Sequence, residues 1–478
     1  MNFNSYLFIL VFLPLTVSGY YIIKRISGSV FAERMYLILV SVFFYCFGGI
    51  LHAALFMAVV LYNFLCFRFM SRMQDSGWKK GILFIGISGN LLWLFYYKYY
   101  NFFVGNLNGL LGTDLPIRDM IMPIGISFIT FQMIAFLVDG YRGEIKQVKI
   151  SEYFVFATFF PKLTVGPITK YNTFIERCKA QEVWENLAGG SFLFIMGLGK
   201  KVILADTFEK AVSFAFADLG SMGTCNMLLV SFMYTLQIYF DFSGYSDMAI
   251  GVGRMFGYEL PINFNSPYKA ADIAQFWERW HMSLTNFFTR YLYIPMGGSR
   301  KGSLRTYRNI MIVFLCSGLW HGADWSFVLW GALHGTAMVV YRIFKEPLSK
   351  IRHGIGVLIT FLFVDFAWIV FRAGSFARLG QVWKALLRWD GFRIQKGIVD
   401  CFSRTDLRFY TGGLVPNVIF MMGFLAVAMI IVFFLPNTQE ICAKKIRSSR
   451  GMAVLCVLIL VVSVMSLSNV TGYIYAMF

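Results

Sequence analysis

Charged residues are scarce in this chain. Asp, Glu, Lys and Arg together make up 14% of its 478 residues, whereas an ordinary globular protein carries roughly a quarter. Hydrophobic residues reach 58% and aromatic residues 18%, which suits helices that face lipid and rings that lie at the headgroup level. The composition leaves little room for a soluble domain and predicts an all-α polytopic membrane protein.

Acidic residues are fewer than basic ones, with 25 Asp and Glu against 43 Lys and Arg. The basic residues lie in short clusters between apolar runs, as the cytoplasmic loops of membrane proteins do, and no single basic domain gathers them. We therefore expect the lipid bilayer as a partner and no nucleic acid.

The eight cysteines are scattered singly, and no C-x-x-C pair occurs. We expect small buried hydrophobes, with neither a metal site nor a disulfide framework. The sequence also lacks a G-x-S-x-G elbow, H-E-x-x-H, a P-loop and G-x-G-x-x-G. The absence of these motifs argues against a soluble hydrolase, a zinc protease or a nucleotide-binding fold.

Apolar runs of spanning or near-spanning length predict roughly 9–11 transmembrane helices. The first run, about 6–23, ends at Lys24 and Arg25 without a small-residue cleavage site, so we expect a retained membrane helix. The second, about 35–67, is expected to break near Gly48 and Gly49. The others lie at about 81–103, 120–139, 188–205, 225–250, 308–341, 354–371, 415–435 and 452–473. No repeat or second domain is visible, which favours a single membrane domain over residues 1–478.

Alternate threading of these runs places most basic clusters on one side of the bilayer, which predicts that side to be the cytoplasm. The amino terminus then lies outside. The segment 373–414 also falls outside although it is rich in Lys and Arg, so its role is left open. The clusters assigned to the cytoplasm are 24–25, 68–80, 142–149, 279–308, 342–352 and 444–450.

The apolar stretch 308–341 begins and ends on the cytoplasmic side in this topology, so it must enter the membrane and return, or cross it twice with shortened helices. Polar residues then lie at membrane depth. Irregular backbone is tolerated there only where protein or a water-filled cavity replaces lipid. We expect this stretch to line an internal cavity.

Histidine is rare, with five residues in the chain. His321 lies in Ser317–Trp325, flanked by apolar sequence, where an ionisable side chain is a functional candidate by default. A neutral imidazole can act as a general base near neutral pH. The alternative is a core histidine satisfied by a neighbouring carbonyl. His334 follows thirteen residues later and is expected to line the same cavity.

His281 lies in Gln275–Ser283, where aromatic and charged residues alternate as in an amphipathic helix at a membrane interface. Taken alone, this histidine is as readily structural as chemical. Glu278 and Arg279 are expected to be ion-pair partners at the interface. His52 and His353 are assigned no role.

Two acids, Asp241 and Asp247, end an apolar run at Gln237–Asp247. They could orient a base or form a hydrogen-bonded packing network, and we favour the structural role. The same two roles are open to Asp139 and Asp324. Asp365, inside the run 361–371, has no explanation from the sequence.

Several motifs occur in a fixed order along the chain. They are Pro123–Gln132, Asp139–Gly143, Phe159–Pro167, Tyr239–Asp247, Phe276–His281, Tyr293–Ser299 and Gly318–Trp325. The ordered set resembles the membrane-bound O-acyltransferases, and within them the branch of the bacterial alginate O-acetyltransferase. The resemblance covers nearly the whole chain. It implies a bundle of transmembrane, re-entrant and interfacial helices around a central tunnel, in the bacterial cytoplasmic membrane.

The resemblance also implies site residues. His321 matches the histidine regarded as catalytic, and His281 matches a second histidine on the cytoplasmic approach to the tunnel. Candidates for lining the tunnel or binding the donor are Trp280, Trp320, Glu278, Arg279, Asp324, His334 and Asp241. Lys162 departs from the family pattern, which has a neutral amide there, and predicts a different partner or acceptor.

Acyl transfer from a thioester needs a base, stabilisation of the oxyanion and exclusion of water. The expected function is transfer of acetyl from cytoplasmic acetyl-coenzyme A, a substrate and not a bound cofactor, to an extracytoplasmic polysaccharide. A separate extracytoplasmic acetyltransferase is the expected partner. The alternatives are D-alanyl transfer to teichoic acid from a carrier protein, a transporter or flippase, and a non-catalytic assembly subunit. Alginate, another exopolysaccharide, cellulose and peptidoglycan all remain open as acceptor.

Overall fold

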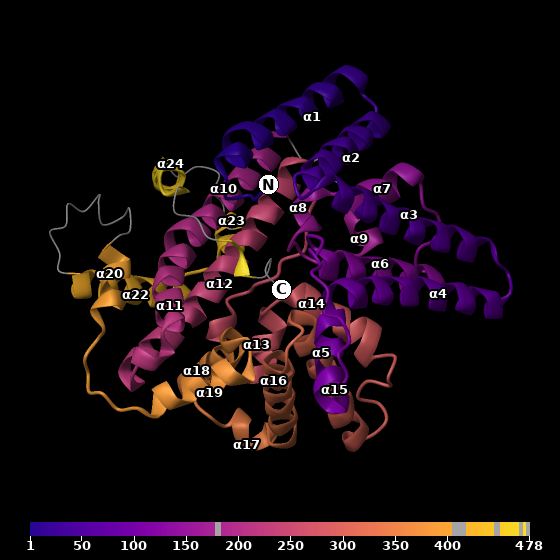
Figure 1. The fold of residues 1–478 in the computed structure, drawn as a ribbon. Helices are drawn as coiled ribbons and strands as arrows, with labels where there is room; N and C mark the ends of the chain where they lie inside the picture. Colours follow the sequence, from indigo (N-terminus) through magenta and orange to yellow (C-terminus); the bar gives the residue numbers. More distant parts are fainter. Residues whose placement is uncertain (177–182, 404–416, 444–449, 468–471, 475–478) are drawn as a thin grey trace. The chain divides into compact units, whose positions relative to one another are not determined.

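The computed structural model describes residues 1–176, 183–403, 417–443, 450–467 and 472–474. Every regular element in these ranges is a helix (Figure 1), which confirms the predicted all-α architecture. Cys178, most of the basic cluster 444–450 and parts of the runs 373–414 and 452–473 lie outside the described residues.

Several helices have the length and composition of membrane spans. Among the described residues, four helices are long and apolar enough: Leu7–Ser27, Ile50–Arg72, Val183–Ala217 and His353–Ala373. Three more, Ile126–Tyr141, Asn417–Phe433 and Arg450–Met465, are shorter apolar helices. A multi-pass membrane protein follows, whereas the predicted count of spans stays a prediction.

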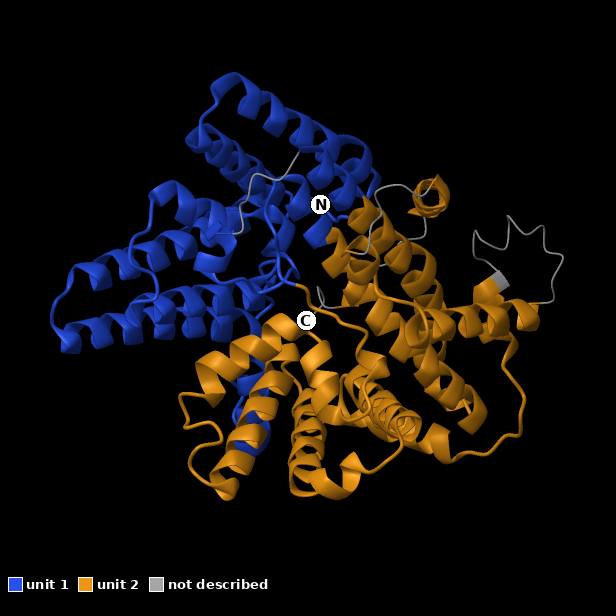
Figure 2. Cartoon of the chain, turned by 180° about the vertical axis from the view of Figure 1, so that it is seen from behind, with its two compact units in different colours: residues 1–191, 249–261 blue, residues 192–248, 262–478 orange. Residues whose placement is uncertain are grey.

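The chain divides into two compact units (Figure 2). One comprises residues 1–191 and 249–261, and the other comprises 192–248 and 262–478. Two helices, α10 (Val183–Gly199) and α12 (Thr224–Met255), contribute residues to both. A single membrane domain over the whole chain stays a prediction.

The first unit contains α1 to α9. Its helices are α1 (Leu13–Ser27), α2 (Val30–Cys46), α3 (Ile50–Arg72), α4 (Ser76–Leu94), α5 (Tyr100–Leu111), α6 (Ile126–Tyr141), α7 (Ile150–Thr158), α8 (Phe160–Leu163) and α9 (Tyr171–Glu176). The predicted break near Gly48 and Gly49 is confirmed, because α2 ends at Cys46 and α3 begins at Ile50. Helix α6 packs against α3 and α4 and is buried along nearly all of its length.

Gly125 explains why two of the ordered motifs occur together. Its φ of +71° is rarely adopted by other residues, and a Cβ at this position would lie 2.0 Å from the carbonyl oxygen of Leu163. The turn before α6 therefore packs directly on the backbone of the Phe159–Pro167 motif.

The second unit contains most of the remaining helices. They are α11 (Asp206–Ala217), α13 (Ile273–Arg279), α14 (Met282–Phe288), α15 (Ser303–His321), α16 (Trp325–Ile343), α17 (Lys345–Ser349), α18 (His353–Ala373), α19 (Phe376–Leu387), α20 (Lys396–Ser403), α22 (Asn417–Phe433), α23 (Thr438–Ala443) and α24 (Arg450–Met465).

Short π-helical turns occur at Leu7–Phe12, Phe95–Tyr99, Lys200–Ala205 and Thr289–Tyr293, and 3₁₀ turns at Leu219–Ser221 and Pro267–Lys269.

Helices α15 and α16 form a hairpin, which confirms that the stretch 308–341 turns back on itself. Their backbones pack closely because a Cβ at Gly318 would lie 2.2 Å from the carbonyl oxygen of Phe327, and one at Gly331 would lie 2.3 Å from that of Phe314. Small residues allow this approach between membrane helices. The Asp324 carboxylate accepts a hydrogen bond from the Ser326 N–H at 2.8 Å and caps α16.

Two local predictions were wrong. Only Cys66 is buried among the described cysteines, and Cys316 is exposed, because an apolar run in a membrane protein has a lipid-facing side as well as a packed one. The second concerns Gln275–Ser283, predicted as one amphipathic helix. Helix α13 ends at Arg279, and His281 has a left-handed φ of 45° before α14 begins.

Candidate functional site

His321 is the last residue of α15 and is 2% exposed. Its ring centroid lies 4.9 Å from that of Trp320, 5.0 Å from Trp330 of α16 and 5.4 Å from Phe371 of α18. Three helices thus enclose the imidazole in aromatic rings. Such surroundings shield the imidazole from bulk water.

His281 is buried between α13 and α14, and backbone contacts fix its position. The Met282 N–H donates to the Asn263 carbonyl at 3.0 Å, and the Ser283 N–H donates to the Asn263 Oδ1 at 3.2 Å. A left-handed conformation is uncommon for a residue with a Cβ and costs about 1–2 kcal/mol. Strain of this kind often marks a functional position.

Trp320 connects the two histidines. The His281 ring lies 6.0 Å from the Trp320 centroid and 4.7 Å from that of Phe242 in α12. His321 contacts the same indole at 4.9 Å. The structure therefore brings together three residues that the sequence predicted for the site.

His334 lies in the same aromatic cluster. It is fully buried in α16, and its Nδ1 accepts a hydrogen bond from the Trp277 Nε1–H at 3.3 Å. Its ring centroid lies 4.8 Å from that of Trp330, which also contacts His321. His321 and His334 thus contact the same indole ring but line neither of the cavities described below, and the role of His334 in binding stays a prediction.

The other candidates around Phe276–His281 differ in their solvent exposure. Trp280 is buried and contacts Trp368 at 4.9 Å between ring centroids. Glu278 is exposed and Arg279 half-buried. The described residues contain no ion pair between Glu278 and Arg279, which contradicts that expectation. Adjacent positions on a helix point in different directions.

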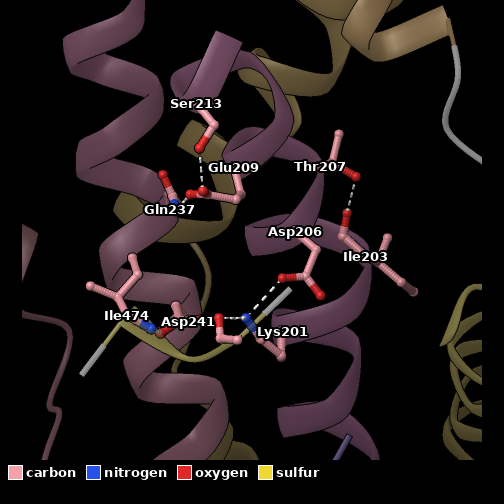
Figure 3. A network of polar contacts seen from close by, with 10 residues as sticks. Lys201, Ile203, Asp206, Thr207, Glu209, Ser213, Gln237, Asp241 and Ile474 are labelled. Atoms are coloured by element: carbon pink, nitrogen blue, oxygen red, sulfur yellow. Dashed lines mark hydrogen bonds and ion pairs between the residues drawn. The ribbon is translucent and has the colours of Figure 1, made fainter. Parts of the chain in front are cut away.

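A cavity of about 440 Å³ with several polar and charged lining residues lies beside Phe371. We call it the Arg372 cavity, and its lining residues are Glu209, Tyr234, Gln237, Phe371, Arg372, Ala373, Gly374, Ser375, Arg378 and Ile474. Gln237 donates to Glu209, and Ser213 donates to the other oxygen of the same carboxylate (Figure 3). Arg372 donates to Ser213 at 3.4 Å. The cavity can offer hydrogen bonds to hydroxyl groups.

A second cavity, of about 250 Å³, lies beside Trp277 and is mainly apolar. We call it the Trp277 cavity, and it is lined by Trp277, Leu284, Thr285, Phe288, Thr289, Tyr293, Ser299, Ile310, Val313, Phe314, Ser317, Met338 and Arg342. Ser317 lies one helical turn before His321, and Arg342 is exposed.

The acids of the membrane region have defined partners. Asp241 forms an ion pair with Lys201 and Asp247 one with Lys200, each at 2.6 Å. Asp365 accepts hydrogen bonds from the hydroxyl groups of Ser231 at 2.8 Å and Thr235 at 2.6 Å. These contacts explain how each carboxyl group is tolerated at a buried position.

The sequence reasoning did not single out Lys201, Asp206, Glu209 or Arg372. The signal was present, because Lys200 and Lys201 interrupt an apolar run and an ionisable residue there is a functional candidate. Spacing alone could not pair them with acids forty residues away. Asp241 was named, but its partner required the fold.

Lys162, the departure from the family pattern, belongs to the first unit and is 3% exposed. Its ammonium nitrogen lies 3.9 Å from the Phe156 ring centroid and 4.3 Å from that of Phe174. It lies outside the candidate membrane spans, and burial lowers its pKa well below its usual range. Direct contact with a partner protein does not fit this buried position.

Comparison with known proteins gives the family. Residues 37–352 match the model of the membrane-bound O-acyltransferase family. The chain is 36% identical over 422 residues to a peptidoglycan O-acetyltransferase of Helicobacter pylori, covering 81% of this chain and 80% of the relative. It is 33% identical over 404 residues to a protein named probable alginate O-acetylase AlgI in Pseudomonas aeruginosa, covering 83% and 76%.

A more distant relative is a teichoic acid D-alanyltransferase of Bacillus subtilis. It is 26% identical over 283 residues, which cover 55% of this chain and 71% of the relative. The predicted family is confirmed by the match to the family model and by the two closer relatives. The chain belongs to the membrane-bound O-acyltransferase family and is a multi-pass O-acyltransferase.

Proposed function

We propose that this chain takes an acetyl group from acetyl-coenzyme A on the cytoplasmic side of a bacterial membrane and delivers it to a hydroxyl acceptor outside. The final acceptor is a glycan, and a separate extracytoplasmic acetyltransferase carries the group to it. O-acetyltransferases among the relatives support the acetyl group and the glycan.

The observation that carries this proposal is the position of His321 with respect to the two cavities. Its ring contacts Phe371, which lines the Arg372 cavity. One turn earlier on the same helix, Ser317 lines the Trp277 cavity. His321 lines neither cavity itself, but it contacts a lining residue of one and lies one helical turn from a lining residue of the other.

The Trp277 cavity suits the donor. Its apolar depth fits an acetyl group and the arm that carries it, while Arg342 at an exposed position can bind phosphate through charge-assisted hydrogen bonds. In the predicted topology Arg342 begins a cytoplasmic cluster, which is where acetyl-coenzyme A is found.

The Arg372 cavity suits the acceptor. Glu209, Gln237 and Arg372 supply acceptors and donors of hydrogen bonds that can hold a hydroxyl group. Arg372 and Gly374 end the span that begins at His353, so the predicted topology places this cavity on the extracytoplasmic side.

The chemistry follows from these positions. His321 accepts the proton of the acceptor hydroxyl as its oxygen attacks the thioester carbonyl. The new C–O bond forms, the C–S bond breaks, and the coenzyme A thiolate leaves and takes up that proton. His281, on the other side of Trp320, is assigned to the donor approach from the family resemblance, where it would help to place the thioester.

Trp330 is our candidate for stabilising the oxyanion. Its ring is fully buried and lies 5.0 Å from that of His321, at an interplanar angle of 86°. Its Nε1–H has no hydrogen-bond partner among the residues that the structure describes. A buried donor of this kind can stabilise the negative charge that develops on the carbonyl oxygen.

A transfer assay in sealed vesicles tests the proposal. With acetyl-labelled acetyl-coenzyme A on the cytoplasmic face, we expect label in short alginate or peptidoglycan oligosaccharides outside only when the partner acetyltransferase is present. Label that requires a D-alanyl carrier protein instead would move the chain to the D-alanyl branch. Uptake of solute without any acetyl product would support a transporter.

A further inference from the structure

A buried charge cluster lies next to the Arg372 cavity. Lys201 is 1% exposed and forms ion pairs with Asp241 at 2.6 Å and Asp206 at 2.8 Å (Figure 3). It lies in the π-helical turn Lys200–Ala205 between α10 and α11, and such turns are frequent at functional sites. A buried ion pair is weak support for stability, so it suggests a role in specifying structure.

The cluster contacts residues 472–474, the last residues that the structure describes. The Lys201 ammonium donates to the Gly472 carbonyl oxygen at 3.0 Å and lies 4.9 Å from the Tyr473 ring centroid. The N–H of Ile474 donates to the Asp241 carboxylate at 3.0 Å. Three successive residues, more than 230 positions away from Asp241 in sequence, are thus bound to one ion pair.

The same helices form both the cluster and the cavity. On α12, Gln237 lines the Arg372 cavity and Asp241 follows one turn later. On α11, Asp206 joins the cluster and Glu209 lines the cavity one turn later. Ile474 itself lines the cavity. A movement of the segment 472–474 would therefore change the wall of the cavity.

We propose that Lys201 and Asp241 are positioning residues that fix the segment 472–474 as a wall of the Arg372 cavity. This wall keeps water from the acyl group and sets the access of the acceptor hydroxyl. The identity of what enters the cavity rests on the proposed function, whereas the anchoring of the segment does not.

The chain contains a matched control for this anchor. The Lys200–Asp247 pair has the same 2.6 Å separation and lies one residue away on one helix and six on the other. Asp247 accepts a hydrogen bond from Gln439, and within the part of the chain that the structure describes neither Lys200 nor Asp247 bonds to the segment 472–474. Replacing either lysine removes one paired lysine charge, from the half-buried Lys200 or from the buried Lys201, but only the Lys201 pair contacts the segment 472–474.

The anchor is tested first by thiol accessibility, which needs no catalytic activity. In the Ile474→Cys chain, with native cysteine labelling subtracted, we expect slow reaction with a membrane-impermeant maleimide. Asp241→Asn or Lys201→Met should accelerate it at least tenfold, and Lys200→Met should not. Equal labelling rates in all variants would overturn the proposal. So would fast labelling of the Ile474→Cys chain that keeps both Lys201 and Asp241.

A second test begins with two variants that keep every buried charge of the anchor. Ile474→Pro removes the N–H that donates to Asp241 and also fixes the backbone φ at this position, whereas Ile474→Ala keeps the N–H. We expect Ile474→Pro to increase coenzyme A release per acetyl product at least fivefold and Ile474→Ala to leave this ratio near the native value. Lys201→Met should also raise this ratio, whereas Lys201→Arg, which keeps the positive charge, should leave it near the native value. A proportional fall in both products would show a merely structural role.

Failure of the two proposals can be distinguished. If neither the native chain nor any variant transfers acetyl groups, but the maleimide rates still depend on Lys201 and not on Lys200, the proposed function fails and the anchor stands. If acetyl transfer is normal and the rates do not differ, the anchor fails alone.

Discussion

The rings of His281 and His321 both contact Trp320, with centroid separations of 6.0 and 4.9 Å. His281 reaches it from the turn between α13 and α14, and His321 from the end of α15. Residues forty positions apart thus share one indole, and the effects of changing them should be coupled.

The two arginines at the cavities should affect different substrates. Arg342→Ala is expected to raise the KM for acetyl-coenzyme A about tenfold, the low end for a charge-assisted hydrogen bond. Arg372→Ala should instead raise the KM for the oligosaccharide acceptor by a similar factor. Initial rates measured against each substrate in turn decide this, and a rise for the same substrate in both variants would refute the assignment.

Trp330→Phe should separate catalysis from packing. Phenylalanine keeps an aromatic ring against His321 but removes the indole N–H. We expect kcat to fall about 100-fold with little change in KM, as when one oxyanion donor is lost. Trp368→Phe, in the same cluster, is a control whose N–H donates to Tyr268 at 3.1 Å. An equal fall in kcat in both variants would argue against Trp330.

The left-handed backbone at His281 predicts an order of stability. Asn tolerates this conformation, whereas a β-branched side chain does not. His281→Asn should therefore remain folded in detergent, and His281→Val should be less stable by about 1–2 kcal/mol. Thermal melting of the purified proteins gives the order. If His281→Asn folds and still transfers acetyl at the native rate, the imidazole has no part in the reaction.

Lys162 predicts a pH dependence of stability. Because burial lowers its pKa in the folded chain, the unfolded chain holds one more proton between the folded and the unfolded pKa. Stability then rises with pH in that window, by at most about 1.4 kcal/mol per unit. Lys162→Gln removes this dependence, so its advantage in melting temperature at pH 7 should shrink toward pH 9.5. A difference that is constant with pH would contradict the lowered pKa.

Much of the fold was predictable because apolar run length and turn residues act locally. The break at Gly48–Gly49 followed from such signals, whereas the returning stretch 308–341 followed from the basic clusters at both of its ends. His321 and His281 were predicted from the ordered motifs, and the fold adds that Trp320 lies against both. Their roles in the reaction stay predictions.

Other features depend on contacts that no local pattern encodes. The end of α13 at Arg279 reflects pairing with Asn263 and Asn265, which lie outside the motif. The partners of Asp241 come from Lys201 and from the end of the chain. Asp365, unexplained in the sequence, is held by two hydroxyl groups of α12. Each case joins segments far apart in sequence.

The most direct measurement compares acetyl transfer in sealed vesicles by the native chain and by His321→Ala at equal membrane expression, with His353→Ala as the control. The account predicts that His321→Ala loses at least about 100-fold in transfer, the low end for a general base, while still binding acetyl-coenzyme A, and that His353→Ala is unchanged. Native rates of transfer in His321→Ala would contradict the account and leave this histidine as a packing residue.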